Sequence, residues 1–213
     1  MWTDRLRRHC LIALFALAAL PLTPAQAQHQ PPQRSAEEWA RIYNDPGRAE
    51  WQKPDEVLKA LALKPHEMIA DIGTGAGYFA RRFAPHVAKV YAVDINVELL
   101  QITARNAPPN VETVLAAPDD PKLPDASVDT AFFCDVVHHI GHRVEYYRRL
   151  ARALRPGGRI VVIDFFKKPL PVGPPVHVKL TPEEVTAELK EAGFRLVRQF
   201  DFLPYQYFLV FQR

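Results

Sequence analysis

The sequence has little cysteine, and this scarcity limits the chemistry it can perform. Its 213 residues include two cysteines, and Cys10 lies in an N-terminal segment that resembles an export signal. Removal of that segment would leave Cys134 alone, which excludes an intramolecular disulfide and a cysteine-based metal cluster. We therefore expect no metal site.

An excess of charge of one sign is also missing. The formal net charge is +3, and the first 27 residues contribute +2 of it through three arginines and one aspartate, which leaves +1 for the rest. No basic run or stripe of alternating basic and aromatic residues is present, so nucleic acid is not an expected partner. A hydrophobic content of 48% in a chain of this length is typical of one globular domain.

The longest apolar run is short. Residues 11–20 form an unbroken stretch of ten apolar residues, which is too few to span a bilayer comfortably. Arginines within residues 5–8 precede the run and Ala-Gln-Ala at 25–27 follows it, which together predict a signal peptide over residues 1–27 and a mature start at Gln28. We expect export, to the periplasm. The alternative is an uncleaved inner-membrane anchor, and only this segment is expected to contact a membrane.

Residues 28–53 are expected to form a polar lead-in and then a helical lid. Ser35 and Glu38 have the spacing of a capping box, which predicts a helix through about Tyr43. This segment holds three aromatic residues suited to cover a bound ligand, Trp39, Tyr43 and Trp51. The alternative, that they only pack on the following domain, stays open.

Strands and helices alternate through the predicted domain at residues 54–213. The predicted strands cover residues 68–72, 89–93, 111–115, 128–134, 159–165, 195–202 and 205–212. Such alternation indicates a parallel sheet covered by helices on both faces. The last two strands are separated by two residues, which permits only antiparallel pairing. We therefore predict a Rossmann-like, doubly wound α/β fold with a mostly parallel seven-stranded sheet and a C-terminal antiparallel hairpin strand.

The stretch "DIGTGAGY", residues 71–78, follows the first predicted strand of the domain. Its three glycines permit close approach of a ligand to the backbone, and a helix N-terminus favours an anionic group. Tyr78 stands where the dinucleotide fingerprint requires glycine, and no phosphate-loop lysine follows. Asp94 ends the next strand, where a carboxylate can accept hydrogen bonds from both hydroxyls of a ribose.

Four segments together resemble a known family. "ADIGTGAGYFA", "VYAVDIN", "LPDASVDTAFFCDVVHHI" and "LARALRPGGRIVVIDF" resemble, in order, the motifs of class I S-adenosylmethionine-dependent methyltransferases of the small-molecule, type 11-like kind. The resemblance covers about residues 54–213. It implies S-adenosylmethionine as cofactor and a small-molecule or lipid-like methyl acceptor.

The resemblance also implies roles for individual residues. The implied cofactor-binding residues are Asp71, Gly73, Thr74, Gly75, Gly77, Asp94, Ile95 and Asp135. The family often has an acid just after the third strand, where this chain has Ala116 and Ala117, so Asp119 or Asp120 is expected to substitute. If the acceptor nucleophile is a hydroxyl or thiol, His138 or His139 is the candidate general base. A structural role for these histidines is the alternative.

Two other functions stay open at this level. The chain could be a non-catalytic S-adenosylmethionine-binding domain, since an acid is missing at Ala117 and no base is certain. It could also be an NAD-dependent oxidoreductase, although Tyr78 argues against that. Neither the acceptor nor the oligomeric state follows from the sequence. The expected export also conflicts with the expected cofactor, because S-adenosylmethionine is made in the cytosol and nothing in the sequence supplies it outside.

Overall fold

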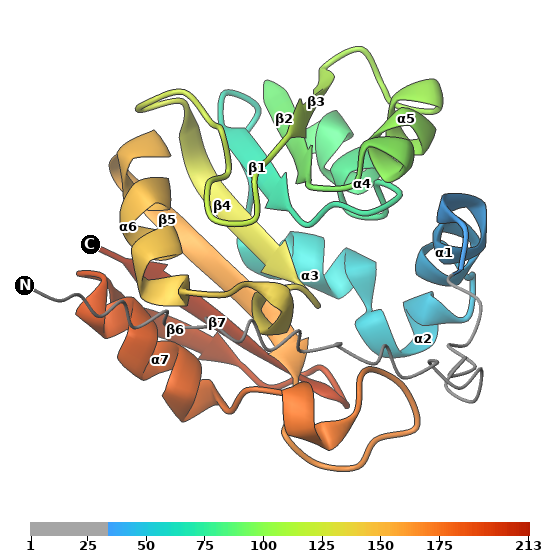
Figure 1. Cartoon of the computed structure of the whole chain (residues 1–213). Helices are drawn as coiled ribbons and strands as arrows, with labels where there is room; N and C mark the ends of the chain where they lie inside the picture. The colour runs from blue at the N-terminus through green and yellow to red at the C-terminus, as the bar shows by residue number, and fades with distance from the viewer. Residues whose placement is uncertain (1–33) are drawn as a thin grey trace, which may run out of the picture. The chain divides into compact units, whose positions relative to one another are not determined.

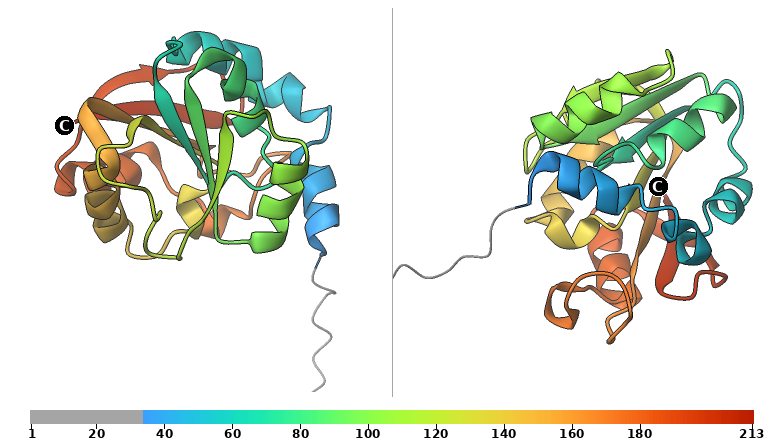
Figure 2. Two further views of the ribbon diagram at one scale, coloured as in Figure 1. Left: turned by 90° about the horizontal axis from the view of Figure 1, so that it is seen from above. Right: turned by 90° about the vertical axis from the view of Figure 1, so that its right-hand side faces the viewer.

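A computed structural model describes residues 34–213, which form one unit (Figures 1 and 2). The predicted signal peptide and its cleavage site lie outside the described residues. Within residues 34–213, no helix is both long and apolar enough to cross a membrane.

A single sheet of seven strands forms the centre of the fold. The strands are β1 (Met68–Ile72), β2 (Lys89–Asp94), β3 (Val111–Leu115), β4 (Val128–Cys134), β5 (Leu154–Phe165), β6 (Arg195–Phe200) and β7 (Gln206–Gln212). Their order across the sheet is β3-β2-β1-β4-β5-β7-β6. The first five strands pair in parallel, and β7 runs antiparallel to both β5 and β6. The predicted fold class, including its antiparallel strand, is confirmed.

Helices cover both faces of this sheet (Figure 1). They are α1 (Ala36–Tyr43), α2 (Arg48–Gln52), α3 (Pro54–Leu61), α4 (Ala80–Phe83), α5 (Val97–Arg105), α6 (Arg143–Ala153) and α7 (Pro182–Glu191), with 3-10 turns at Ala84–His86, Val137–His139 and Val176–Val178. Tyr147 of α6 and Leu189 of α7 are buried in the core of one face. Leu61 of α3 and Phe83 of α4 are buried in the core of the other. The sheet is therefore doubly wound.

Local sequence signals place several helix ends. The side chain of Ser35 accepts a hydrogen bond from the backbone N–H of Glu38, and the Glu38 carboxylate accepts from the N–H of Ser35, which forms the expected capping box. The side chain of Asn96 caps α5 by accepting from two backbone N–H groups. The sequence does not predict α2, which has only five residues. It ends at Lys53, whose left-handed backbone (φ 45°) turns the chain into α3.

The carboxyl ends of four parallel strands meet at one edge of the sheet. Ile72 of β1 is level with Val93 of β2 and with Phe133 of β4, and Cys134 of β4 is level with Ile163 of β5. The residues that follow these strands therefore gather at this edge, where ligands bind in open α/β sheets.

Candidate functional site

Residues 73–77, the glycine loop, follow β1 and lie at this edge of the sheet. The backbone N–H groups of Gly73 and Thr74 donate to the carbonyl of Val93, at 2.8 and 3.0 Å, which ties the loop to β2. Gly73 has φ of +70°, and a Cβ there would lie 2.8 Å from the Cβ of Val136. A Cβ on Gly75 would lie 3.0 Å from the ring of Tyr43. The loop therefore needs glycine, because Val136, which follows β4, and Tyr43 of the N-terminal lid both pack closely against its backbone.

Asp94 lies beside the loop, as predicted. Its Oδ2 accepts from the N–H of Gly75 at 2.8 Å and its Oδ1 accepts from the N–H of Asn96 at 2.9 Å. Each carboxylate oxygen can accept more than one hydrogen bond, so Asp94 can still receive two hydroxyls. Ile95 and Leu115, at the ends of β2 and β3, are 61% and 55% exposed and offer apolar surface next to this carboxylate. These residues fit a ribose joined to a flat ring, which is the nucleoside part of the expected cofactor.

Asp71 is buried beneath the loop. The hydroxyl of Thr74 donates to its Oδ2 at 2.7 Å. Burial raises the pKa of Asp71 to about 6, although the hydrogen bond from Thr74 opposes this shift. The observed contacts show that Asp71 and Thr74 brace the loop from within. Their direct contact with a cofactor stays a prediction.

Asp119 and Asp120 lie in the turn that follows β3. The Asp119 carboxylate pairs with Arg149 at 2.6 Å, and the Asp120 carboxylate pairs with Lys122 at 2.8 Å. Both carboxylates are thus engaged with cations at the surface, and neither hydrogen-bonds to the glycine loop in residues 34–213. Their role as substitutes for the family's acid stays a prediction.

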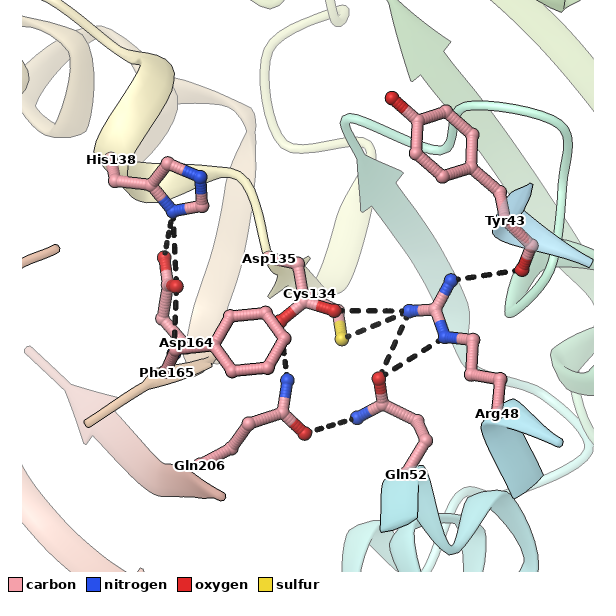
Figure 3. A network of polar contacts seen from close by, with 9 residues as sticks. All are labelled: Tyr43, Arg48, Gln52, Cys134, Asp135, His138, Asp164, Phe165 and Gln206. Atoms are coloured by element: carbon pink, nitrogen blue, oxygen red, sulfur yellow. Dashed lines mark hydrogen bonds and ion pairs between the residues drawn. The ribbon is translucent and has the colours of Figure 1, made fainter. Parts of the chain in front are cut away.

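Asp135 follows β4 and belongs to a polar network (Figure 3). Its Oδ2 lies 3.2 Å from Nη2 of Arg48, and its Oδ1 accepts a hydrogen bond from Gln206. Gln206 in turn accepts from Nε2 of Gln52 at 2.7 Å. Burial raises the pKa of Asp135 to about 6, and the nearby guanidinium of Arg48 limits the rise.

Arg48 is the functional candidate that the sequence did not reveal. Its guanidinium donates to the side chain of Gln52 and to the carbonyl of Tyr43, in addition to its pairing with Asp135. The same group stacks on the ring of Tyr78, 4.2 Å from its centroid, and only 11% of the side chain is exposed. A single arginine in a short helix has no periodicity that marks it. Its position between Tyr43 and Trp51, in the predicted lid, was the one available signal.

His138 contacts a buried acid at the end of β5. Its Nδ1 lies 2.9 Å from Oδ2 of Asp164, and the two side chains are 3% and 1% exposed. The tautomer of His138 with its proton on Nδ1 would donate to this carboxylate and leave Nε2 as the basic nitrogen. The ring of His139 lies 4.2 Å from that of His138, and partial burial lowers the pKa of His139. The sequence singled out both histidines and placed Asp164 near the same pocket as a structural residue, but it did not predict that Asp164 pairs with His138.

The lid meets a second segment over the site. The rings of Trp51 and Phe165 lie 5.6 Å apart, and Trp51 also approaches Tyr205 at 6.5 Å. Gly173, from the proline-rich loop 166–180, packs so closely on Phe165 that a Cβ would lie 2.8 Å from its ring. Phe165 is therefore the point where the N-terminal lid and this loop converge.

Comparisons with known proteins agree with this geometry. Residues 70–162 match the model of a family described as a methyltransferase domain. The chain is 31% identical over 157 residues to 27-O-demethylrifamycin SV methyltransferase of Amycolatopsis mediterranei, a match covering 65% of this chain and 58% of the relative. It is 26% identical over 148 residues to phosphoethanolamine N-methyltransferase 1 of Arabidopsis thaliana, covering 66% of this chain and 28% of the relative. The chain thus spans only part of the length of these relatives.

A solved structure is similar over most of the fold. The crystal structure of an S-adenosylmethionine-dependent methyltransferase from Aquifex aeolicus superposes with a TM-score of 0.78 at 27% identity, and the match covers 84% of this chain and 98% of that one. The fold, the glycine loop with its neighbouring acid, and these similarities agree. The domain match and the solved structure are consistent with a class I, type 11-like S-adenosylmethionine-dependent methyltransferase, and they support S-adenosylmethionine as the cofactor.

Proposed function

We propose that this protein transfers the methyl group of S-adenosylmethionine to a small-molecule or lipid-like acceptor, with His138 as the base that prepares the acceptor. The observation that carries this proposal is the contact between His138 and Asp164 at the same sheet edge as the glycine loop. Val136, which packs against Gly73, is two residues from His138. The base and the cofactor loop are thus adjacent.

The residues of the chain have separable tasks in this proposal. When bound, the cofactor supplies an electrophilic methyl group on a sulfonium. Asp94 holds the ribose hydroxyls, and the apolar side chain of Ile95 supports the adenine. His138 accepts the acceptor's proton at Nε2, while Asp164 orients the ring and stabilises its protonated form. Methyl transfer from a sulfonium then depends mainly on alignment of the two reactants.

The acceptor side of the site is apolar and aromatic. The ring of Trp51 lies near two others, 5.6 Å from that of Phe165 and 6.5 Å from that of Tyr205 by centroid distance. Such a surface favours an acceptor with a flat or aliphatic body and one ionisable hydroxyl, thiol or amine. Because the side chain of His138 is almost fully buried, the segments packed over it must move before an acceptor can reach it.

The test begins with binding and continues to turnover. Calorimetric titration with S-adenosylmethionine should show micromolar affinity that is lost in Asp94→Ala, and NAD should not bind. Release of S-adenosylhomocysteine is then measured with a panel of hydroxyl, thiol and amine acceptors, for wild type and His138→Gln. Binding without turnover on any acceptor would favour a non-catalytic cofactor-binding domain. Binding of NAD in place of S-adenosylmethionine would refute the proposal.

We propose in addition that the protein is exported and cleaved after Ala27. The support is the sequence alone: an arginine-rich start, ten apolar residues and an Ala-Gln-Ala site. Fractionation of cells followed by N-terminal sequencing tests this directly. A periplasmic protein that starts at Gln28 is the expected result, whereas an intact N-terminus in the inner-membrane fraction would support the anchor.

A further inference from the structure

We propose that Arg48 is the binding residue for the α-carboxylate of the methyl donor, and that Arg48 and Asp135 together recognise its amino-acid end. This inference rests on the proposed function, because it concerns the same cofactor site. Arg48 lies outside residues 70–162, the part of the chain that matches the family model.

The position of Arg48 is the first support. Asp94 and Ile95 occupy the β2 side of the glycine loop, where they fit the nucleoside. The methionine part must then extend toward the β4 side of the loop, where Val136 packs against Gly73. Arg48 lies on this side, in contact with Cys134 and Asp135.

Charge complementarity is the second support. An α-amino acid carries an ammonium and a carboxylate on the same carbon. The structure places one anion and one cation 3.2 Å apart at the β4 side of the loop, in Asp135 and Arg48. A zwitterion can bind to such a pair without leaving either buried charge uncompensated, which would be costly. A cationic side chain alone at this position would repel the sulfonium.

Several contacts also fix the guanidinium of Arg48 in an orientation that lets it bind a carboxylate. Gln52 accepts from Nε and Nη2 at 3.2 and 3.0 Å, and the carbonyl of Tyr43 accepts from Nη1 at 3.1 Å. Stacking on Tyr78 fixes the plane of the group. Arginine has five N–H donors, and among residues 34–213 the second Nη1 hydrogen has no partner. It can be donated to a carboxylate while the contact with Asp135 is kept.

Two other arginines lie nearby but are placed differently. Arg81 donates to the carbonyl of Ala76 and to the side chain of Asn44. Arg82 stacks on Tyr78 at 3.8 Å from the ring centroid and donates to the carbonyl of that residue, and it forms no ion pair with an acid of residues 34–213. Like Arg48→Gln, Arg82→Gln removes a guanidinium that stacks on the ring of Tyr78. It therefore serves as the matched control.

The test compares methyl donors with and without the carboxylate. Calorimetry measures binding of S-adenosylmethionine, S-adenosylhomocysteine and decarboxylated S-adenosylmethionine to wild type, Arg48→Gln, Arg48→Lys and Arg82→Gln. Circular dichroism and thermal unfolding confirm that each variant is folded. Loss of a charged hydrogen bond to the carboxylate should weaken binding of the first two ligands to Arg48→Gln by about 10- to 100-fold. Binding of the decarboxylated donor to this variant should be unchanged or stronger.

The outcomes separate this inference from the proposed function. In Arg48→Lys the loss of affinity for the two carboxylate-bearing ligands should be partial. In Arg82→Gln the affinities for all three ligands should match those of wild type. An equal loss for all three ligands in Arg48→Gln would overturn the inference, because Arg48 would then only support the lid. Unchanged or tighter binding of S-adenosylmethionine to Arg48→Gln would also overturn it. If wild type itself bound no S-adenosylmethionine, the proposed function would fail instead.

Discussion

The Nδ1 atom of His138 lies 2.9 Å from the carboxylate of Asp164, and both side chains are almost completely buried. The pair joins the ends of β4 and β5, next to the strand that carries the glycine loop. A histidine oriented by a buried acid has one defined basic nitrogen, which is the requirement for proton removal from an acceptor.

The pair predicts a specific loss of turnover. In His138→Gln, kcat with the identified acceptor should fall by about 10²- to 10⁴-fold, which is the usual contribution of a general base. The dissociation constant of S-adenosylmethionine should stay within a factor of about 3, because the histidine does not bind the donor. Asp164→Asn should lower kcat by an intermediate factor and His139→Gln by less. A His138→Gln enzyme with wild-type kcat would assign the histidine a structural role.

Gly73→Ala should damage the loop. The new Cβ would enter the space of the Val136 side chain, on a backbone with φ of +70°. Strain and overpacking together should lower the free energy of unfolding by about 1–4 kcal/mol, and the affinity for S-adenosylmethionine should fall with it. Urea unfolding and calorimetry measure the two effects.

A second substitution isolates the cause. Val136→Ala in the Gly73→Ala background should restore part of the stability, since it removes the methyl groups in the way. A double variant less stable than Gly73→Ala would show that backbone strain, rather than this contact, dominates.

Asp71 should make stability depend on pH. Its pKa is raised by burial to about 6 in the folded protein, above the ordinary value of 3.8. The folded state therefore binds this proton more tightly, and Asp71 lowers the free energy of unfolding as pH rises from about 4 to about 6. The free energy of unfolding of Asp71→Asn, relative to that of wild type, should rise by up to about 3 kcal/mol over that pH interval. Urea unfolding at several pH values measures the difference, and one that does not vary with pH would contradict the assignment.

Trp51 should hold the lid closed. In Trp51→Ala the contacts with Phe165 and Tyr205 are lost, so opening of α2 should become about 2- to 10-fold more frequent. Hydrogen exchange of the α2 amides reports this opening, and Trp51→Phe should retain most of the protection. Unchanged exchange in Trp51→Ala would show that the lid is held by the Arg48 network instead.

Much of the fold was readable from the sequence because its signals are local. Apolar strand segments and the cap residues Ser35 and Asn96 each determine structure through near neighbours. The strand-end residues Asp94 and His138 could also be placed, because parallel strands bring their carboxyl ends to one edge.

The rest of the site depends on contacts between distant parts of the chain. Gln52 and Gln206 are ordinary polar residues until the fold brings them together, and α2 is too short to show a period. Asp119 and Asp120 are residues whose position could be predicted but whose contacts could not. Position after β3 made them candidates, but the sequence could not show that Arg149 and Lys122 engage their carboxylates.

The hydrogen bond between Gln52 and Gln206 spans 154 positions of sequence, which has a consequence for the order of folding. Gln206 belongs to β7, which inserts between β5 and β6. The environment of Asp135 therefore cannot be completed during synthesis until β7 has left the ribosome and paired. Contacts of such long range form late and slowly. A nascent chain that has already formed β1 to β5 would still lack the finished site.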